Sequence, residues 1–150
     1  MIDVITNSND ITIGSFDIVP NLAGSQVVEV YYKNGTYVGS ETTPAAWTLL
    51  GTYTINGTAG TLINLAVDPL TLTAGTVTGI YVNYDAQYTN GDNVYSDANI
   101  SIETGVGLCG DFSGVNLSRS FNGAVNYYLC GSNIIPVDAV VEPIPNLSYI

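Results

Sequence analysis

The stretch AWTLLGTYTI, residues 46–55, decides the fold class of this chain. Its large apolar side chains alternate with threonines, namely Trp47, Leu49, Tyr53 and Ile55 against Thr48, Thr52 and Thr54. Successive side chains of a β-strand point to opposite faces of the sheet, so we expect the apolar set on one face and the threonines on the other. The pattern therefore predicts a half-buried strand.

The same alternation recurs on both sides of this stretch, and amphipathic helical spacing does not. Further strands are predicted at residues 2–6, 11–19, 26–33, 61–67, 77–84, 98–104 and 124–130. Asn-Gly pairs at 34–35, 56–57 and 90–91 favour tight hairpin turns, and Asp68-Pro69 favours the end of a strand. About eight or nine short strands at this spacing predict an all-β chain: one antiparallel β-sandwich, jelly-roll-like or immunoglobulin-like.

Charge removes several classes of function. The chain of 150 residues has no histidine, and Lys33 and Arg119 are its only bases against 13 acids, giving a net charge of -11. Nucleic acids and anionic membranes would repel it, and general acid–base chemistry near neutral pH usually needs histidine. We therefore expect a non-enzymatic protein that does not bind nucleic acid. No apolar run approaches the ~20 residues of a membrane span.

The last twenty residues differ from the rest. We expect a β-sandwich domain over residues 1–130, followed by an extended apolar tail over 131–150 with prolines at 136, 143 and 145. The apolar tail residues are Ile134, Ile135, Val137, Val140, Val141, Ile144, Leu147 and Tyr149. A tail of this composition predicts docking on another copy by edge-strand addition.

Two small sets of residues could carry more specific chemistry. Cys109, in a glycine-rich segment, and Cys130 form either one disulfide or two free thiols. The loop from Asp85 to Asp97, with Asp92 and Asn93 between them, supplies hard oxygen ligands that suit Ca²⁺, and it is equally a solvated loop.

The eleven tyrosines leave two readings open. Rings on an outer sheet face stack on sugars or fill protein interfaces, and rings on neighbouring strands also pack on one another within the sheet. We expect the two bases, Lys33 and Arg119, to pair with nearby acids, inside the domain or across a subunit contact.

Residues 27–52, VVEVYYKNGTYVGSETTPAAWTLLGT, are the most distinctive part of the chain. They resemble a β-sandwich domain of large secreted and cell-surface proteins of Bacteroidetes and other aquatic bacteria, in which a VEVYYK strand, a G-x-Y-x-G turn and an AWTLLG strand follow one another. YTNG at 88–91 and Tyr95-Ser96 also fit, so the resemblance covers about residues 1–130. It implies a β-sandwich outside the cell and brings no catalytic residue. Cys109 and the tail depart from it.

These observations favour a self-assembling structural subunit of an extracellular, cell-surface or phage-particle assembly, such as a filament, sheath, coat or fibre. Its partner would be itself, with subunits joined by exchange of the tail or an edge strand. The alternative is a carbohydrate-binding or adhesion module that recognises surface glycans, with or without Ca²⁺.

Overall fold

The computed structural model describes residues 1–129 and the backbone of residues 137–140. This part of the chain is almost entirely β-structure. The elements are β1 (Ile2–Thr6), β2 (Ile11–Ile18), β3 (Gly24–Asn34), the 3-10 turn η1 (Pro44–Ala46), β4 (Thr48–Gly57), β5 (Ile63–Leu72), β6 (Val77–Asn83), β7 (Tyr88–Asn90), β8 (Val94–Ser96), β9 (Ile100–Gly110), β10 (Ser113–Phe121), β11 (Gly123–Leu129) and β12 (Val137–Val140). None of these residues belongs to a helix long and apolar enough to cross a membrane.

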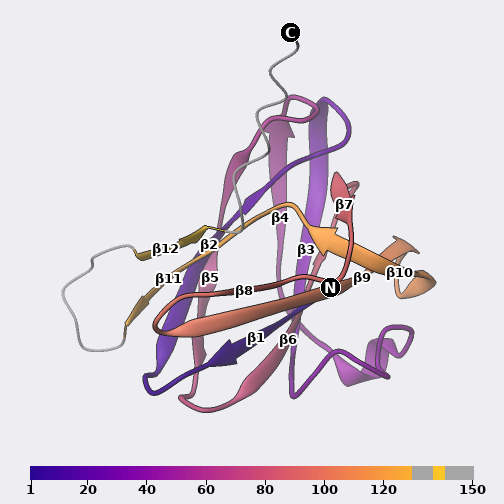
Figure 1. The fold of residues 1–150 in the computed structure, drawn as a ribbon. Coiled ribbons are helices and arrows are strands. Elements are labelled where there is room, and N and C mark those ends of the chain that lie inside the picture. The colour runs from indigo at the N-terminus through magenta and orange to yellow at the C-terminus, as the bar shows by residue number, and fades with distance from the viewer. Residues whose placement is uncertain (130–136, 141–150) are drawn as a thin grey trace, which may run out of the picture.

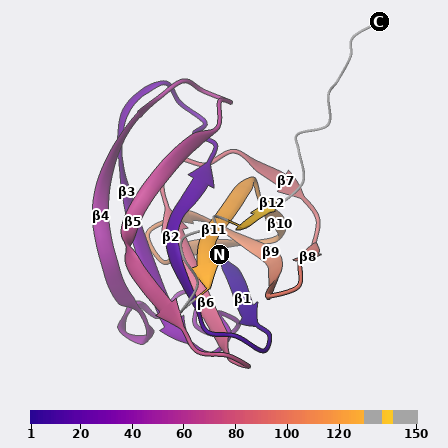
Figure 2. The same cartoon turned by 90° about the vertical axis from the view of Figure 1, so that its left-hand side faces the viewer.

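The strands form two antiparallel sheets that pack against each other (Figures 1 and 2). The large sheet has the order β4-β3-β6-β1-β9-β10-β7, with β8 also paired to β9, and the small sheet has the order β12-β11-β2-β5. The predicted all-β antiparallel sandwich is therefore confirmed, although it has more strands than the eight or nine expected.

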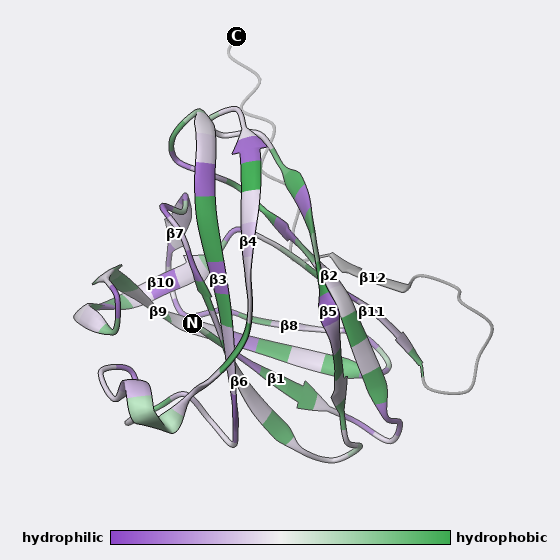
Figure 3. Cartoon of the chain, turned by 180° about the vertical axis from the view of Figure 1, so that it is seen from behind, coloured by the Kyte–Doolittle hydropathy of each residue, from purple (hydrophilic) through white to green (hydrophobic). Residues whose placement is uncertain are grey.

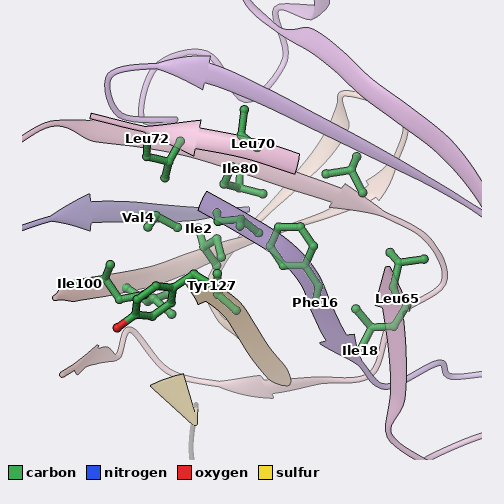
Figure 4. Packing of buried hydrophobic residues seen from close by; sticks show 14 of the residues in the cluster. Ile2, Val4, Phe16, Ile18, Leu65, Leu70, Leu72, Ile80, Ile100 and Tyr127 are labelled. Carbon is green, nitrogen blue, oxygen red and sulfur yellow. The ribbon is translucent and has the colours of Figure 1, made fainter. Parts of the chain in front are cut away.

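The core lies between the two sheets (Figure 4). Ile2, Val4 and Ile80 of the large sheet meet Phe16 and Leu65 of the small sheet, and all five are almost completely inaccessible to solvent. Fully burying a side chain of this size contributes about 1.5–3 kcal/mol, so this shared interior is what holds the sheets together. Hydrophobic and hydrophilic residues alternate along several strands, as Figure 3 shows.

All eight predicted strands are present, and four were not predicted: β7, β8, β10 and β12. β7 and β8 have three residues each, too few for an alternation to be recognised. β10 contains Gly114 and Ser118 at φ 66° and 54°, and its pairing with β9 shifts register between Leu117 and Arg119. Such a bulge interrupts the period-two pattern.

Asp68-Pro69 does not end a strand, contrary to the prediction. β5 continues to Leu72, and its register with β2 passes from Ser15↔Ala66 to Ile13↔Leu70, so residues 67–69 lie opposite one residue of β2. The bulge and the edge position of β5 explain why proline is tolerated, because no ladder hydrogen bond is required of its nitrogen there.

The three Asn-Gly pairs do not make two-residue hairpins either. Gly35, at φ 81°, opens a connection that runs through η1 before β4 begins. Gly57 ends β4, and β7 and β8 on either side of Gly91 pair with different strands. The tight hairpin lies instead in the glycine-rich segment around Cys109, where Gly110 pairs with Ser113 across Asp111 and Phe112.

The single apolar face predicted for residues 46–55 is wrong at two of its four residues, Trp47 and Leu49, whereas Tyr53 and Ile55 lie on the core side. Val30 pairs with Gly51 but Tyr31 pairs with Leu49, so Leu50 is an extra residue on β4. This bulge turns Leu50 toward the main core and leaves Leu49 48% exposed. Trp47 is buried on the opposite, outer face of the large sheet, in a second apolar cluster.

Candidate functional site

A groove of about 690 Å³ opens in the large sheet where β6 and β9 part from each other. β1 lies between these strands, and its pairing reaches Ile80 on one side and Thr104 on the other, both opposite Ile2. β6 then continues to Asn83 and β9 to Gly110 with no strand between them among the residues that the structure describes. Met1 lines this β6–β9 groove, and Figure 1 shows the N-terminus in the middle of the large sheet.

Backbone groups face the groove from both walls. On the β6 side, even-numbered residues turn their peptide groups toward β1 and the groove, as Thr76 O shows by accepting the N–H of Thr6. Odd-numbered residues turn theirs away, as Gly79 N–H shows by donating to Gly35 O. Since successive residues of a strand direct their peptide groups to opposite sides, Val82 presents its peptide group toward the groove, and Tyr84 follows in the bend after β6. On β9 the Met1 ammonium donates to Val106 O at 2.8 Å, and Leu108 is the next residue turned the same way.

One end of the groove is polar. Asn83 Nδ2 donates to Asp111 Oδ1 at 2.8 Å and to Glu29 Oε2 at 3.3 Å, so one amide holds two carboxylates. The Tyr31 hydroxyl donates to Glu29 Oε2 at 3.0 Å, and the Tyr81 hydroxyl donates to Asn83 Oδ1 at 2.9 Å. These five side chains form one connected hydrogen-bond network.

The tyrosines of this network stay protonated. Burial raises the pKa of Tyr81, and the neighbouring Asp111 raises it further. Burial, the hydrogen bond to Glu29 and the charge of Glu29 raise the pKa of Tyr31. Both hydroxyls are therefore donors at neutral pH, which suits polar recognition better than proton abstraction.

Four rings pack on the outer face of the large sheet beside the groove: Tyr31, Trp47, Tyr81 and Phe112. We call them the outer aromatic cluster. Tyr31 stacks on Tyr81 with centroids 5.9 Å apart, and Phe112 makes an edge contact with Tyr81 at 5.1 Å. Trp47 lies at 6.2 Å from Tyr81. Cross-strand packing, one of the two readings of the tyrosines, is therefore confirmed for Tyr31 of β3 and Tyr81 of β6.

The opposite wall carries the only basic side chain among the residues that line the groove. The Arg119 guanidinium carbon lies 4.9 Å from the centroid of the Tyr88 ring, and Nη1 donates to the carbonyls of Leu117 and Ser118. Lys33 Nζ likewise donates to the carbonyls of Asn34 and Thr36. Over residues 1–129 neither base pairs with a carboxylate, so the expectation of ion pairs inside the domain is wrong there.

The four residues predicted to bind Ca²⁺ do not gather. Asp85 lines the groove, and Asp92 Oδ2 accepts a long contact of 3.4 Å from Ser118. Asn93 N–H donates to Thr104 Oγ1. No group of three or more His, Cys, Asp or Glu side chains suited to a metal occurs in the described part of the chain.

Asp97 has a structural task instead. Its Oδ1 accepts the backbone N–H groups of Asn99 and Ile100, and its Oδ2 accepts the Tyr127 hydroxyl at 2.6 Å. Burial, with the Asp97 hydrogen bond second, raises the pKa of Tyr127 to about 12. The carboxylate thus ties the turn before β9 to β11 of the other sheet.

Cys109 is exposed on β9 and lines the groove, where Asn116 Nδ2 lies 2.9 Å from its Sγ. Its expected disulfide partner, Cys130, lies outside the described residues, so the disulfide stays a prediction. The same holds for the tail residues Ile134, Ile135, Val141, Ile144, Leu147 and Tyr149. Val137 and Val140 are described as backbone only, at the two ends of β12, where they pair with Tyr127 and Ala124 of β11.

Known proteins offer no guide to this groove. No family model, curated protein or solved structure matches the chain. The resemblance to a secreted β-sandwich domain therefore stays a prediction, and the function must be argued from the geometry.

Sequence reasoning missed the groove and its network of Glu29, Asn83 and Asp111. One signal was available: the predicted strand at 2–6 is shorter than its later neighbour at 77–84. Only the pairing register, however, places the surplus length of β6 and β9 at the same end of β1.

Proposed function

We propose that this protein is a non-enzymatic structural subunit that assembles with copies of itself outside the cell or on the surface of a virus particle. Its copies join when a strand or the tail of one copy is added to a sheet of the next. The observation that carries the proposal is the β6–β9 groove, which offers strand backbone on two walls at a place where residues 1–129 supply no strand between them. Extended segments bind such edges through main-chain hydrogen bonds.

The exposed side chains support contacts of this kind. Leu117, Val94 and Val27 are 71%, 65% and 61% exposed, and all three lie on strands of the large sheet. Both bases of the chain are engaged with backbone carbonyls. Contacts between copies would therefore use backbone edges, apolar side chains and uncharged polar groups rather than networks of ion pairs.

Two truncations test the proposal. A chain ending at Val140 keeps β12 and loses the rest of the tail, and a chain ending at Gly131 loses both. We expect the full chain to form oligomers or filaments in light scattering and negative-stain microscopy, and both shortened chains to stay monomeric with unchanged β-sheet circular dichroism. A matched control replaces residues 141–150 by ten Gly and Ser residues. Shortened chains that assemble as well as the full chain would refute tail exchange, and a monomeric full chain would refute assembly.

A second candidate function is binding of a neutral saccharide, which the polar end of the groove favours. Amide, carboxylate and hydroxyl groups converge there at Asn83, Glu29 and Tyr31, and the exposed Tyr88 ring lies across the groove. Sugars are recognised by such polar groups together with an aromatic face. A glycan array read with and without chelator tests this, with Asn83→Ala as the variant that should lose binding. No binding by the native chain would exclude it.

A further inference from the structure

We infer that residues 146–150, NLSYI, of one copy enter the β6–β9 groove of a second copy as an added strand in line with β1. This inference rests on the proposed self-assembly and names the segment and the acceptor. It concerns strand addition inside a sheet, between two walls, rather than at an outer edge.

The lengths agree. β9 runs six residues beyond Thr104, whereas β6 runs three residues beyond Ile80, after which residues 84–87 still line the groove on that side. With Met1 taking the first position, about five extended residues fit beside β9, and the first two of these positions also lie beside β6. A strand between two walls must donate and accept on both sides, so proline is not tolerated there. Pro143 and Pro145 exclude the earlier part of the tail, and five proline-free residues follow Pro145 in the sequence.

The apolar and polar sides of the groove also match the alternation of apolar and polar residues in NLSYI. Val82 and Tyr84, which pack toward the main core, turn apolar groups to one side of the groove, and Asn83 turns a polar group to the other. In NLSYI the apolar Leu147 and Tyr149 alternate with Asn146 and Ser148. One register therefore places both large side chains on the core side.

The hydrogen bonds of β1 fix that register. Ile2 lies opposite Thr104, but the Met1 ammonium donates to Val106 O instead of Gly105 O, so β9 has one extra residue here. Continuing the line of β1 past Met1, alternate core-side positions fall beside Val82 and Gly107, and then beside Tyr84 and Cys109. If Tyr149 took the position beside Val82 and Gly107, the next residue, Ile150, would overlap with Met1. Tyr149 therefore belongs beside Tyr84 and Cys109.

The sequence between β12 and residues 146–150 favours an extended linker. Val140 pairs with Ala124, so residue 141 starts on the small sheet. Pro143 and Pro145 favour an extended path at about 3.1 Å per residue, so five such residues span about 16 Å.

Charge does not oppose the contact. The groove carries Glu29, Asp85 and Asp111 against Arg119 alone. Residues 146–150 have no charged side chain, so this segment enters an acidic groove without side-chain repulsion.

Disulfide trapping between full-length chains tests the inference. In a Cys130→Ser background, one chain keeps Cys109 as its only thiol, and a second carries Cys109→Ser with Tyr149→Cys. Directly paired strand residues lie within the Cα separation that a disulfide needs. We expect a covalent heterodimer on oxidation, in which mass spectrometry finds Cys109 of the first chain linked to the new thiol at position 149 of the second. A control moves the acceptor thiol to the other end of β1, by Cys109→Ser with Asn9→Cys, and we expect the product to be lost.

The outcomes separate this inference from the proposed function. Light scattering of the native full chain under the same conditions reports assembly independently. If the native chain assembles and the heterodimer does not form, residues 146–150 do not occupy the groove and the inference is overturned while assembly stands. In a protein that carries both thiols, a link between positions 109 and 149 that forms only within one chain also overturns it. If the native chain remains monomeric, both fail.

Discussion

Asp3 on β1 accepts a hydrogen bond from the backbone N–H of Tyr37 at 2.9 Å, across 34 residues of sequence. Its other carboxylate oxygen accepts the Thr36 hydroxyl, and the Asp3 side chain is only 5% exposed. This carboxylate fastens the start of the connection between β3 and β4 to the outer face of the large sheet. The same connection carries Trp47, so Asp3 positions one border of the outer aromatic cluster.

Replacing Asp3 should loosen the connection between β3 and β4 that Asp3 holds to the large sheet. In Asp3→Ala the buried N–H of Tyr37 and the hydroxyl of the exposed Thr36 lose their acceptor, which predicts a loss of about 2–3 kcal/mol in the free energy of unfolding. Asp3→Asn keeps one acceptor oxygen for Tyr37 N–H and should lose about half as much. Urea titration followed by the fluorescence of Trp47, the single tryptophan of the chain, measures both. An Asp3→Ala variant as stable as the native chain would show that Asp3 does not hold this connection.

The amino group of Met1 should make stability depend on pH. Burial lowers its pKa from 8.0 to about 5, with the charge of Asp3 opposing the shift. Because the unfolded state binds more protons than the folded state between these values, stability should rise from pH 5 to pH 8 and level off above pH 8. Three pH units correspond to at most about 4 kcal/mol.

No histidine titrates in that window, and ordinary carboxyl groups titrate mostly below it, so the effect can be assigned. Urea unfolding of a protein whose first residue is Met1, at pH 5, 6, 7 and 8, measures the slope. Acetylating the Met1 nitrogen removes the titration and should flatten the curve. A slope that survives acetylation would place its origin in another group.

Leu49 and Leu50 should differ sharply, although they are neighbours with the same side chain. Leu50 packs against the main core, and Leu49 faces solvent. Leu50→Ala should therefore cost about 2–3 kcal/mol, whereas Leu49→Ala should stay within about 0.5 kcal/mol. Chemical denaturation of the two variants side by side decides between the bulged strand and unbroken alternation. The opposite order of the two losses would contradict the bulge.

Leu49, Leu50 and their neighbours on β4 show how far the sequence could predict this fold. Strand positions were predictable because alternation is a local property, and Tyr53 and Ile55 share one face, the core side, as the alternation predicted. The bulge at Leu50, the passage of β5 through Pro69 and the extension of β6 and β9 past Ile2 were not, because each depends on which residues of two strands pair with each other. The groove follows from such a register, so its residues could not be predicted.

Salt should strengthen association between copies. Copies of net charge -11 repel each other, and the screening length falls from about 30 Å at 0.01 M salt to about 8 Å at 0.15 M. With both bases bonded to backbone carbonyls, few attractive ion pairs are available to be weakened by the same screening. Sedimentation velocity at 10, 50 and 150 mM NaCl should show larger species as salt rises, and MgCl₂ should act at lower concentration. A neutral osmolyte at matched osmolarity is the control, since it screens no charge. Association that weakens with NaCl would mean that ion pairs join the copies, and that strand addition through uncharged groups is not what holds them together.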